Sequence, residues 1–383
     1  MNSNQALNGL RILDFSTLLP GPFASLYLAD LGAEVTHIVS PYQTDLMREL
    51  EPFADGRATA HAYLNRNKHS LALDLKDPEN IAQIYDKIGE YDIVIEQFRP
   101  GVMQRLGLDY PKLQQIHPGL IYCSITGFGQ TGPMRHKAGH DINFLARSGI
   151  ASQCVSASGQ PVPMGVQLGD VAGGAYHAVI AILAAVIERA RSGLGQAIDI
   201  SMTDCVAALN TMSAAAALAG NTKPRVGHEP LNGGSFYNYY QTQDGRYLAV
   251  GGIETKFRQG LAQILQIEQL ADPDLSFDQL DYSTLQPKLI AAFQTKTLAQ
   301  WQALFAEQDL CVEPVLYVEE ALQSELAQAR LWVVQVPISD DTLETQAQLG
   351  CPIKFSRSSM RYDFIGQLEP NESWEALSKK TAN

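Results

Sequence analysis

The sequence has 383 residues, of which 45% are hydrophobic and 18% are charged. A chain of this length and composition has room for more than one domain and a large apolar core, which excludes disorder of the whole chain. Lys and Arg number 28 against 41 Asp and Glu, and the net charge is −13. This balance argues against nonspecific binding to nucleic acid or to an anionic membrane.

The 5 cysteines are widely spaced and include no Cys-x-x-Cys pair. This pattern indicates reduced thiols rather than a disulfide framework or a zinc ribbon. No basic segment followed by an apolar one opens the sequence, so we expect no signal peptide and a cytoplasmic location. The apolar stretch 171–187 contains glycine and histidine, and we expect a buried helix there rather than a membrane span.

The first 130 residues alternate between predicted strands and helices. Strands are expected at 10–15, 33–39, 70–75, 93–96 and 120–125, with helices over 23–31 and 78–89. This alternation predicts an α/β fold with a parallel sheet, Rossmann-like in outline. Neither a G-x-G-x-x-G after the first strand nor a G-x-x-x-x-G-K-[ST] loop occurs, so dependence on NAD or ATP is not expected.

The second half of the chain predicts a different unit. A loop and long helix over 165–191 precede a strand at 197–201, and two strand-like runs flank Asp244-Gly245, which is a hairpin signal. Helical patterns follow, and strand-like sequence returns near Val333. The predicted domains are 1–224, the N-terminal part of a large domain; 225–330, a small hairpin-and-helix domain with linkers; and 331–383, a return to the large domain.

His140, in the segment Gly-His-Asp-Ile-Asn at 139–143, is the first candidate for chemistry. Histidine has an ordinary pKa that suits proton transfer near neutral pH, whereas a histidine satisfied within a loop is the structural alternative. His136 lies four residues earlier, but no third ligand of the H-E-x-x-H kind is present, so no metal site is expected.

Asp170, at the start of the apolar helix, is the second candidate. Its carboxylate is expected either to cap the first-turn amides or to leave those amides for an oxyanion. We expect the small residues 172–174 to let a ligand approach the backbone closely. Glu254 follows the hairpin and is typical of a solvated surface when taken alone. Arg99, beyond the end of a strand, is placed either to meet an anionic ligand or to form a surface salt bridge.

Several different short motifs are spread along nearly the whole chain, at 9–13, 20–22, 28–35, 71–76, 98–102, 126–133, 193–196 and 355–357. Together they resemble the class III CoA-transferase (CaiB/BaiF) superfamily. The segment G-H-D-I-N-F at 139–144 and V-G-G-I-E ending at Glu254 resemble its α-methylacyl-CoA racemase branch.

The resemblance implies a racemase that inverts the α-carbon of a 2-methylacyl-CoA thioester by two-base proton transfer through an enolate. His140 would serve one face, with Glu254 hydrogen-bonded to it, and Asp170 the other, while amides at the start of the 171–190 helix would stabilise the enolate oxygen. No cofactor is required, because coenzyme A is part of the substrate. The alternatives are a CoA-transferase with Asp170 as nucleophile and a non-catalytic acyl-CoA-binding protein.

The resemblance also implies an interlocked homodimer. His140 and Asp170 would come from one subunit and Glu254 from the other. Neither nucleic acid nor a membrane is expected as a partner. Contacts to CoA are expected from Leu73, Gln97, Phe98, Arg99, Arg105, Gly139, Asp141, Ile142, Asn143 and Phe144.

Three positions depart from the family pattern, and one of them is Arg147, which stands where the family usually has an apolar residue near the acyl site. His37 and Ser40 stand where arginines are usual, one of them near the CoA phosphates. The departure leaves three alternatives: Arg66 or Lys68 compensates, CoA binds weakly, or the carrier differs.

Overall fold

The computed structural model describes residues 4–156, 158–220, 229–339 and 342–381. The chain divides into two compact units: Met1–Ile150, Met164–Leu209 and Glu325–Asn383 form the first, and Ala151–Pro163 and Asn210–Ser324 form the second. The predicted boundary at 224/225 lies outside the described residues. Helix α9 (Thr211–Leu218) falls in the second unit, and its alanine-rich sequence offers no change of composition that would mark the division.

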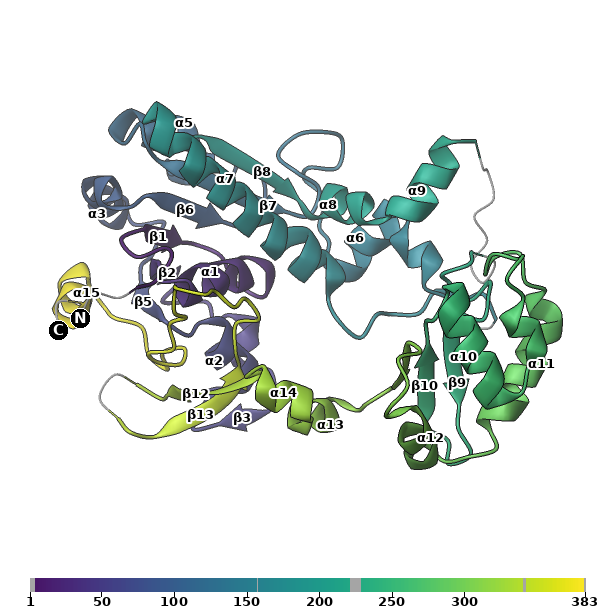
Figure 1. The fold of residues 1–383 in the computed structure, drawn as a ribbon. Helices are drawn as coiled ribbons and strands as arrows, with labels where there is room; N and C mark the ends of the chain where they lie inside the picture. Colours follow the sequence, from purple (N-terminus) through teal and green to yellow (C-terminus); the bar gives the residue numbers. More distant parts are fainter. Residues whose placement is uncertain (1–3, 157, 221–228, 340–341, 382–383) are drawn as a thin grey trace. The chain divides into compact units, whose positions relative to one another are not determined.

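Six parallel strands form the central sheet of the first unit, in the order β5-β2-β1-β6-β7-β8 (Figure 1). They are β1 (Arg11–Asp14), β2 (Glu34–Val39), β5 (Lys68–Ala72), β6 (Ile93–Glu96), β7 (Ile121–Thr126) and β8 (Ala197–Ser201). The predicted parallel α/β sheet is thus confirmed. The strand order reverses between β1 and β6, where folds of this class bind their ligands.

Helices cover both faces of this sheet because successive side chains of its strands point to opposite sides. Ile12 and Ile93 belong to one core and Leu13 and Val94 to the other. The first layer contains α1 (Pro20–Asp30), α6 (Asp141–Ser148), the π-helix η4 (Gly169–Tyr176), α7 (His177–Ser192) and α8 (Met202–Leu209). The second contains α3 (Pro78–Lys87), α4 (Val102–Leu106), α5 (Tyr110–Ile116) and α15 (Trp374–Thr381).

The C-terminal segment returns to the first unit. Its predicted strand near Val333 is confirmed as β12 (Val333–Pro337), which pairs with β13 (Thr345–Leu349). Asn371 pairs with Leu71 of β5, and Figure 1 shows this yellow end of the chain beside the purple N-terminal elements. The remaining short elements of this unit are β3 (Phe53–Ala54), β4 (Arg57–Ala58), α2 (Thr59–Leu64) and α14 (Glu325–Ala329).

The second unit contains the predicted hairpin. Strands β9 (Asn238–Gln241) and β10 (Tyr247–Val250) are antiparallel around Asp244-Gly245, and β11 (Val312–Pro314) pairs with β10. Helices α10 (Thr255–Leu265), α11 (Tyr282–Phe293) and α12 (Leu298–Phe305) pack on this sheet, and α13 (Val318–Gln323) follows β11.

The long apolar helix is only half covered. Gly169–Ser192 is long and apolar enough to cross a membrane by length and composition, a test that core helices also pass. Ala178 and Ile182 are fully buried, whereas Ile180 and Ile187 are 64% and 65% exposed. The expected burial of this helix is therefore correct for one face and wrong for the other.

Candidate active site

His140 is the N-cap residue of α6, and its backbone is held on both sides. Asn143 Oδ1 accepts a hydrogen bond from the His140 amide at 3.0 Å, and the Asn143 amide donates to the His140 carbonyl at 2.8 Å. Phe144 is buried and fixes the helix on the unit, with its ring centroid 5.4 Å from that of Phe128. A Cβ atom at Gly139 would lie 2.7 Å from the Phe144 ring, so glycine is needed there. This segment presents His140 at the surface.

Asp170 lies in the first turn of the π-helix η4, a rare helical form that is frequent at functional sites. Its side chain is partly buried and receives no hydrogen bond from the part of the chain that the structure describes. Burial, and then the neighbouring Asp141 carboxylate, raise the pKa of Asp170 to about 7. A carboxyl that titrates near neutral pH is able both to take and to give a proton.

Asp141 connects the two candidates. Its Oδ1 accepts hydrogen bonds from the amides of Gly169 at 2.6 Å and Asp170 at 3.1 Å. Because Asp141 directly follows His140, this contact brings the His140 and Asp170 segments together within the first unit. The Asp141 side chain thus holds two amides of the protein through Oδ1, and its contact to CoA stays a prediction.

The amides expected to serve an oxyanion at the start of the long helix are already occupied. Those of Gly169 and Asp170 donate to Asp141, and that of Val171 donates to the Gln167 carbonyl at 2.9 Å. Each of these donors has a single hydrogen to give. The prediction of free donors at this helix start is wrong for these three residues.

Gly173 and Gly174 of η4 are buried and serve packing rather than ligand approach. A Cβ atom at Gly173 would lie 2.8 Å from Val206 of α8, and one at Gly174 would lie 2.9 Å from Pro20 of α1. The expectation that these glycines open the backbone to a ligand is wrong, because neighbouring helices fill that space.

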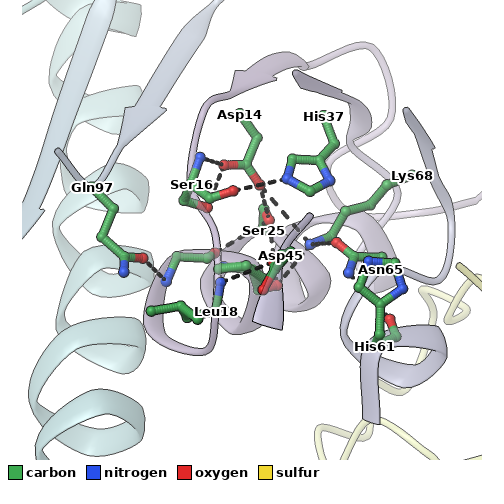
Figure 2. A network of polar contacts seen from close by, with 12 residues as sticks. Asp14, Ser16, Leu18, Ser25, His37, Asp45, His61, Asn65, Lys68 and Gln97 are labelled. Carbon is green, nitrogen blue, oxygen red and sulfur yellow. Dashed lines mark hydrogen bonds and ion pairs between the residues drawn. The ribbon is translucent and has the colours of Figure 1, made fainter. Parts of the chain in front are cut away.

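Five of the ten residues expected to bind CoA lie at the start of α6, namely Gly139, Asp141, Ile142, Asn143 and Phe144. The other five, Leu73, Gln97, Phe98, Arg99 and Arg105, follow β5 or β6 at the carboxyl edge of the sheet. Gln97 Oε1 accepts from the Gly21 amide at 2.9 Å and so joins the segment after β6 to the start of α1 (Figure 2). The Leu73 side chain is buried, whereas Arg99 and Arg105 are exposed. The two arginines are therefore the members of this group that are free to reach a phosphate.

Arg66 and Lys68 do not replace the missing arginines. Arg66 is 1% exposed and paired with Asp30, and Lys68 is fully buried. Figure 2 shows the Lys68 ammonium turned inward, where it donates to the Pro22 carbonyl at 2.8 Å and lies 3.9 Å from Asp14. The alternative in which one of these residues compensates is therefore wrong.

His37, at one of the departing positions, is also buried. Its Nε2 lies 2.8 Å from the Ser16 carbonyl oxygen (Figure 2). Burial lowers the pKa of His37, so its ring is neutral near pH 7. Since a carbonyl only accepts, Nε2 carries the proton and donates it. His37 thereby fixes the loop between β1 and α1 and offers no charge to a ligand.

Glu254 belongs to the second unit, where it is the N-cap residue of α10. The amides of Phe257 and Arg258 donate to its carbonyl, each at 3.0 Å. These bonds engage the backbone of Glu254.

Asp170→Asn is expected to raise the free energy of unfolding at pH 8 by about 1–2 kcal/mol. The folded-state pKa of Asp170 is raised, so the stabilisation from its neutral carboxyl is full at low pH and is lost as the pH rises through about 7. Asparagine is neutral throughout. Urea unfolding of both proteins at pH 4 and pH 8 measures the difference, which should be small at pH 4; an equal gain at both would contradict the titration.

Comparison with known proteins gives one family. A model described as CoA-transferase family III matches residues 7–364. An alpha-methylacyl-CoA racemase of Mus musculus is 37% identical over 320 residues, which are 83% of this chain and 80% of the relative. A succinate–glutarate CoA-transferase of Agrobacterium fabrum is 33% identical over 94% of this chain and 92% of its own. The crystal structure of a CAIB/BAIF family protein from Brucella suis matches with a TM-score of 0.83 and 28% identity, covering 99% of this chain and 100% of that one. The chain belongs to the CoA-transferase family III.

Proposed function

We propose that this protein is a racemase that inverts the α-carbon of a 2-methylacyl-CoA thioester. Inversion requires removal of a proton from one face of the carbon and delivery of a proton to the other. The observation that carries the proposal is the Asp141 contact, which joins the segment of His140 to a carboxyl whose pKa is about 7. Identity to racemases, 37% in mouse and 35% in human, supports the same choice.

In this mechanism His140 takes the α-proton, and the electron pair of the C–H bond passes into the enolate of the thioester. Asp170 returns a proton to the opposite face, and the roles reverse for the other enantiomer. The enolate oxygen needs donors, of which one is typically worth about 3 kcal/mol. The amides of Asp141 and Ile142 open α6 beside His140 and have no hydrogen-bond partner among the described residues, so we assign this role to them.

Coenzyme A enters as part of the substrate, and its remote binding energy helps to position the acyl group. Arg99 lines a cavity of about 400 Å³ together with Tyr110, Tyr122 and Asp199. An arginine beside aromatic and hydrogen-bonding groups suits a phosphorylated nucleotide. We assign the nucleotide end of CoA to the cavity that Arg99 lines, with Arg105 nearby on α4. The proposed reaction uses no resident metal or cofactor.

A homodimer forms part of the proposal. Tyr176, Ile180 and Ile187 are exposed on η4 and α7 at spacings of four and seven residues, which gives a continuous apolar stripe. A second copy of the chain that covers this stripe would remove it from water and would allow Glu254 of the partner subunit to orient the His140 imidazole. A cytoplasmic location is proposed from the widely spaced cysteines, which indicate reduced thiols. The acidic composition argues against nucleic-acid or membrane partners.

CoA transfer is the second candidate function. The Asp170 carboxyl accepts no hydrogen bond from the described residues and so is free to attack a thioester carbonyl. The attack would form an acyl anhydride with Asp170 and release CoA as thiolate. A second carboxylate would then attack the Asp170 carbonyl, release the first acid and form a new anhydride. The CoA thiolate would attack the acyl carbonyl of the second acid, giving the new thioester and restoring the Asp170 carboxylate. The 33% identity to a succinate–glutarate CoA-transferase supports this alternative.

One incubation separates these functions. The protein is mixed with a single enantiomer of a 2-methylacyl-CoA in heavy water, without an acceptor acid. The racemase incorporates deuterium at the α-carbon and produces the other enantiomer. The transferase leaves the α-carbon unlabelled, yields an acyl group that hydroxylamine traps on the protein, and turns over only when a second carboxylic acid is added. Binding without either reaction would contradict both functions.

A further inference from the structure

We propose that Asp141 is a positioning residue for the reaction, which holds Asp170 in place against the start of α6 and, through its negative charge, keeps Asp170 able to carry a proton. This inference rests on the proposed function, because it assigns a task to Asp141 within the same proton transfer. It also moves the role of the Asp141 side chain from contact with CoA to the control of Asp170.

The geometry of the contact carries the inference. Asp141 Oδ1 is shared between two amides, at 2.6 Å from that of Gly169 and 3.1 Å from that of Asp170. Hydrogen bonds to a charged acceptor are stronger than those between neutral groups. Gly169 is buried, and a Cβ atom there would lie 2.9 Å from the same oxygen, so glycine permits the close approach. Two segments that are distant in the sequence are thereby joined at one carboxylate.

The charge of Asp141 supplies the second part of the role. Burial comes first among the causes that raise the pKa of Asp170 to about 7, and the Asp141 carboxylate comes second. A like charge nearby favours the protonated form of a carboxyl. Asp141 is the one charged side chain that acts on Asp170 in this way among the described residues. Other titratable groups on the elements around η4 are Tyr27, Asp30, Tyr122, Cys123, Arg147, His177, Glu188, Arg189, Arg191, Asp199, Asp204 and Cys205.

Asp141→Asn tests the charge while it keeps an oxygen that accepts from both amides. The pKa of Asp170 is expected to fall by about one unit in this variant. Carbon-13 NMR titration of the aspartate carboxyls measures the shift, and Asp170→Asn identifies the signal. The limb of the pH–rate profile that belongs to Asp170 should move by the same amount. For the enantiomer from which Asp170 removes the α-proton, exchange at pH 9, where Asp170 is ionised in both proteins, should slow by about three- to tenfold with the KM for acyl-CoA unchanged, because a weaker base removes the proton less readily.

Asp77→Asn is the matched control. Asp77 is the N-cap residue of α3, and its Oδ1 accepts a hydrogen bond from the Glu79 amide at 2.9 Å. This variant loses a capping charge in the same unit but should leave the Asp170 titration and the pH–rate profile unchanged. If Asp141→Asn proves unstable, Asp141→Ser provides a smaller neutral acceptor for the same titration.

The outcomes separate the inference from the proposed function. An Asp170 titration that is identical in the wild type and in Asp141→Asn would overturn the role of Asp141, whatever reaction the protein performs. A wild-type protein that exchanges no α-proton would overturn the racemase, yet the NMR titration would still report on the Asp141 charge. A rise in KM at constant kcat in Asp141→Asn would restore Asp141 to substrate binding and contradict the inference.

Discussion

His140→Ala is expected to reduce the rate of α-proton exchange from a 2-methylacyl-CoA in heavy water by about 10²–10⁴-fold. The imidazole is proposed to remove the proton from one face of the α-carbon, and alanine has no group that replaces it. Asp170 alone serves one face, so the variant should also fail to interconvert the enantiomers. The rate of deuterium incorporation, followed by mass spectrometry, measures the loss.

His136→Ala is the matched control for this variant. His136 is exposed on the same connecting segment, four residues before His140, and its Nε2 faces the Arg135 guanidinium at 3.0 Å. The His136→Ala variant should exchange the α-proton at the wild-type rate. His140→Ala that retains full exchange would end the racemase proposal. A variant that loses exchange but still transfers CoA to a second acid would show that the histidine serves inversion and the aspartate serves both reactions.

The sheet was predictable because its signals are local. Strand β6 begins and ends where the mainly apolar run at 93–96 does, since central parallel strands are buried on both faces and read as short apolar segments. The edge strand β8 matches the strand predicted at 197–201. The exposure of Ile180 and Ile187 on α7 was not predictable, because an apolar helix face has the same sequence pattern whether its partner is the same chain or another.

In the candidate site, too, local sequence predicts some features and not others. His140 and Asp170 could be named from their neighbours in the sequence, but the bond from Asp141 to the Gly169 amide joins positions 28 residues apart, and no periodic pattern marks it. Likewise, Lys68 was one of the two residues offered as a replacement for the missing arginines, a role that needs an ammonium group within reach of a ligand. It is buried because Asp14, the Pro22 carbonyl and Asn65 surround its ammonium group, which a linear pattern does not reveal.

Asp30→Ala is expected to lower the free energy of unfolding by about 3–5 kcal/mol at pH 7, because removing one partner leaves a buried charge without compensation. Asp30 and Arg66 are each 1% exposed, and two guanidinium nitrogens donate to the carboxylate at 2.8 and 2.5 Å. Arg66 Nη1 also donates to the Leu349 carbonyl at 2.6 Å, and Asn67 donates to Asp30 at 3.0 Å. The pair thus joins α1 and the start of β5 to the C-terminal return.

Urea unfolding of four proteins measures this effect: the wild type, Asp30→Ala, Arg66→Met, and Asp30→Leu combined with Arg66→Met. The double variant should recover part of the loss, because apolar side chains of similar volume avoid the cost of burying two charges. Arg11→Ala is the matched control, since its pairs with Glu34 and Glu90 are exposed and should contribute less than about 1 kcal/mol. Equal losses from Asp30→Ala and Arg11→Ala would contradict a buried ion pair. The C-terminal return would then be held on the first unit by apolar contacts, such as those of the fully buried Val336 and Ile365.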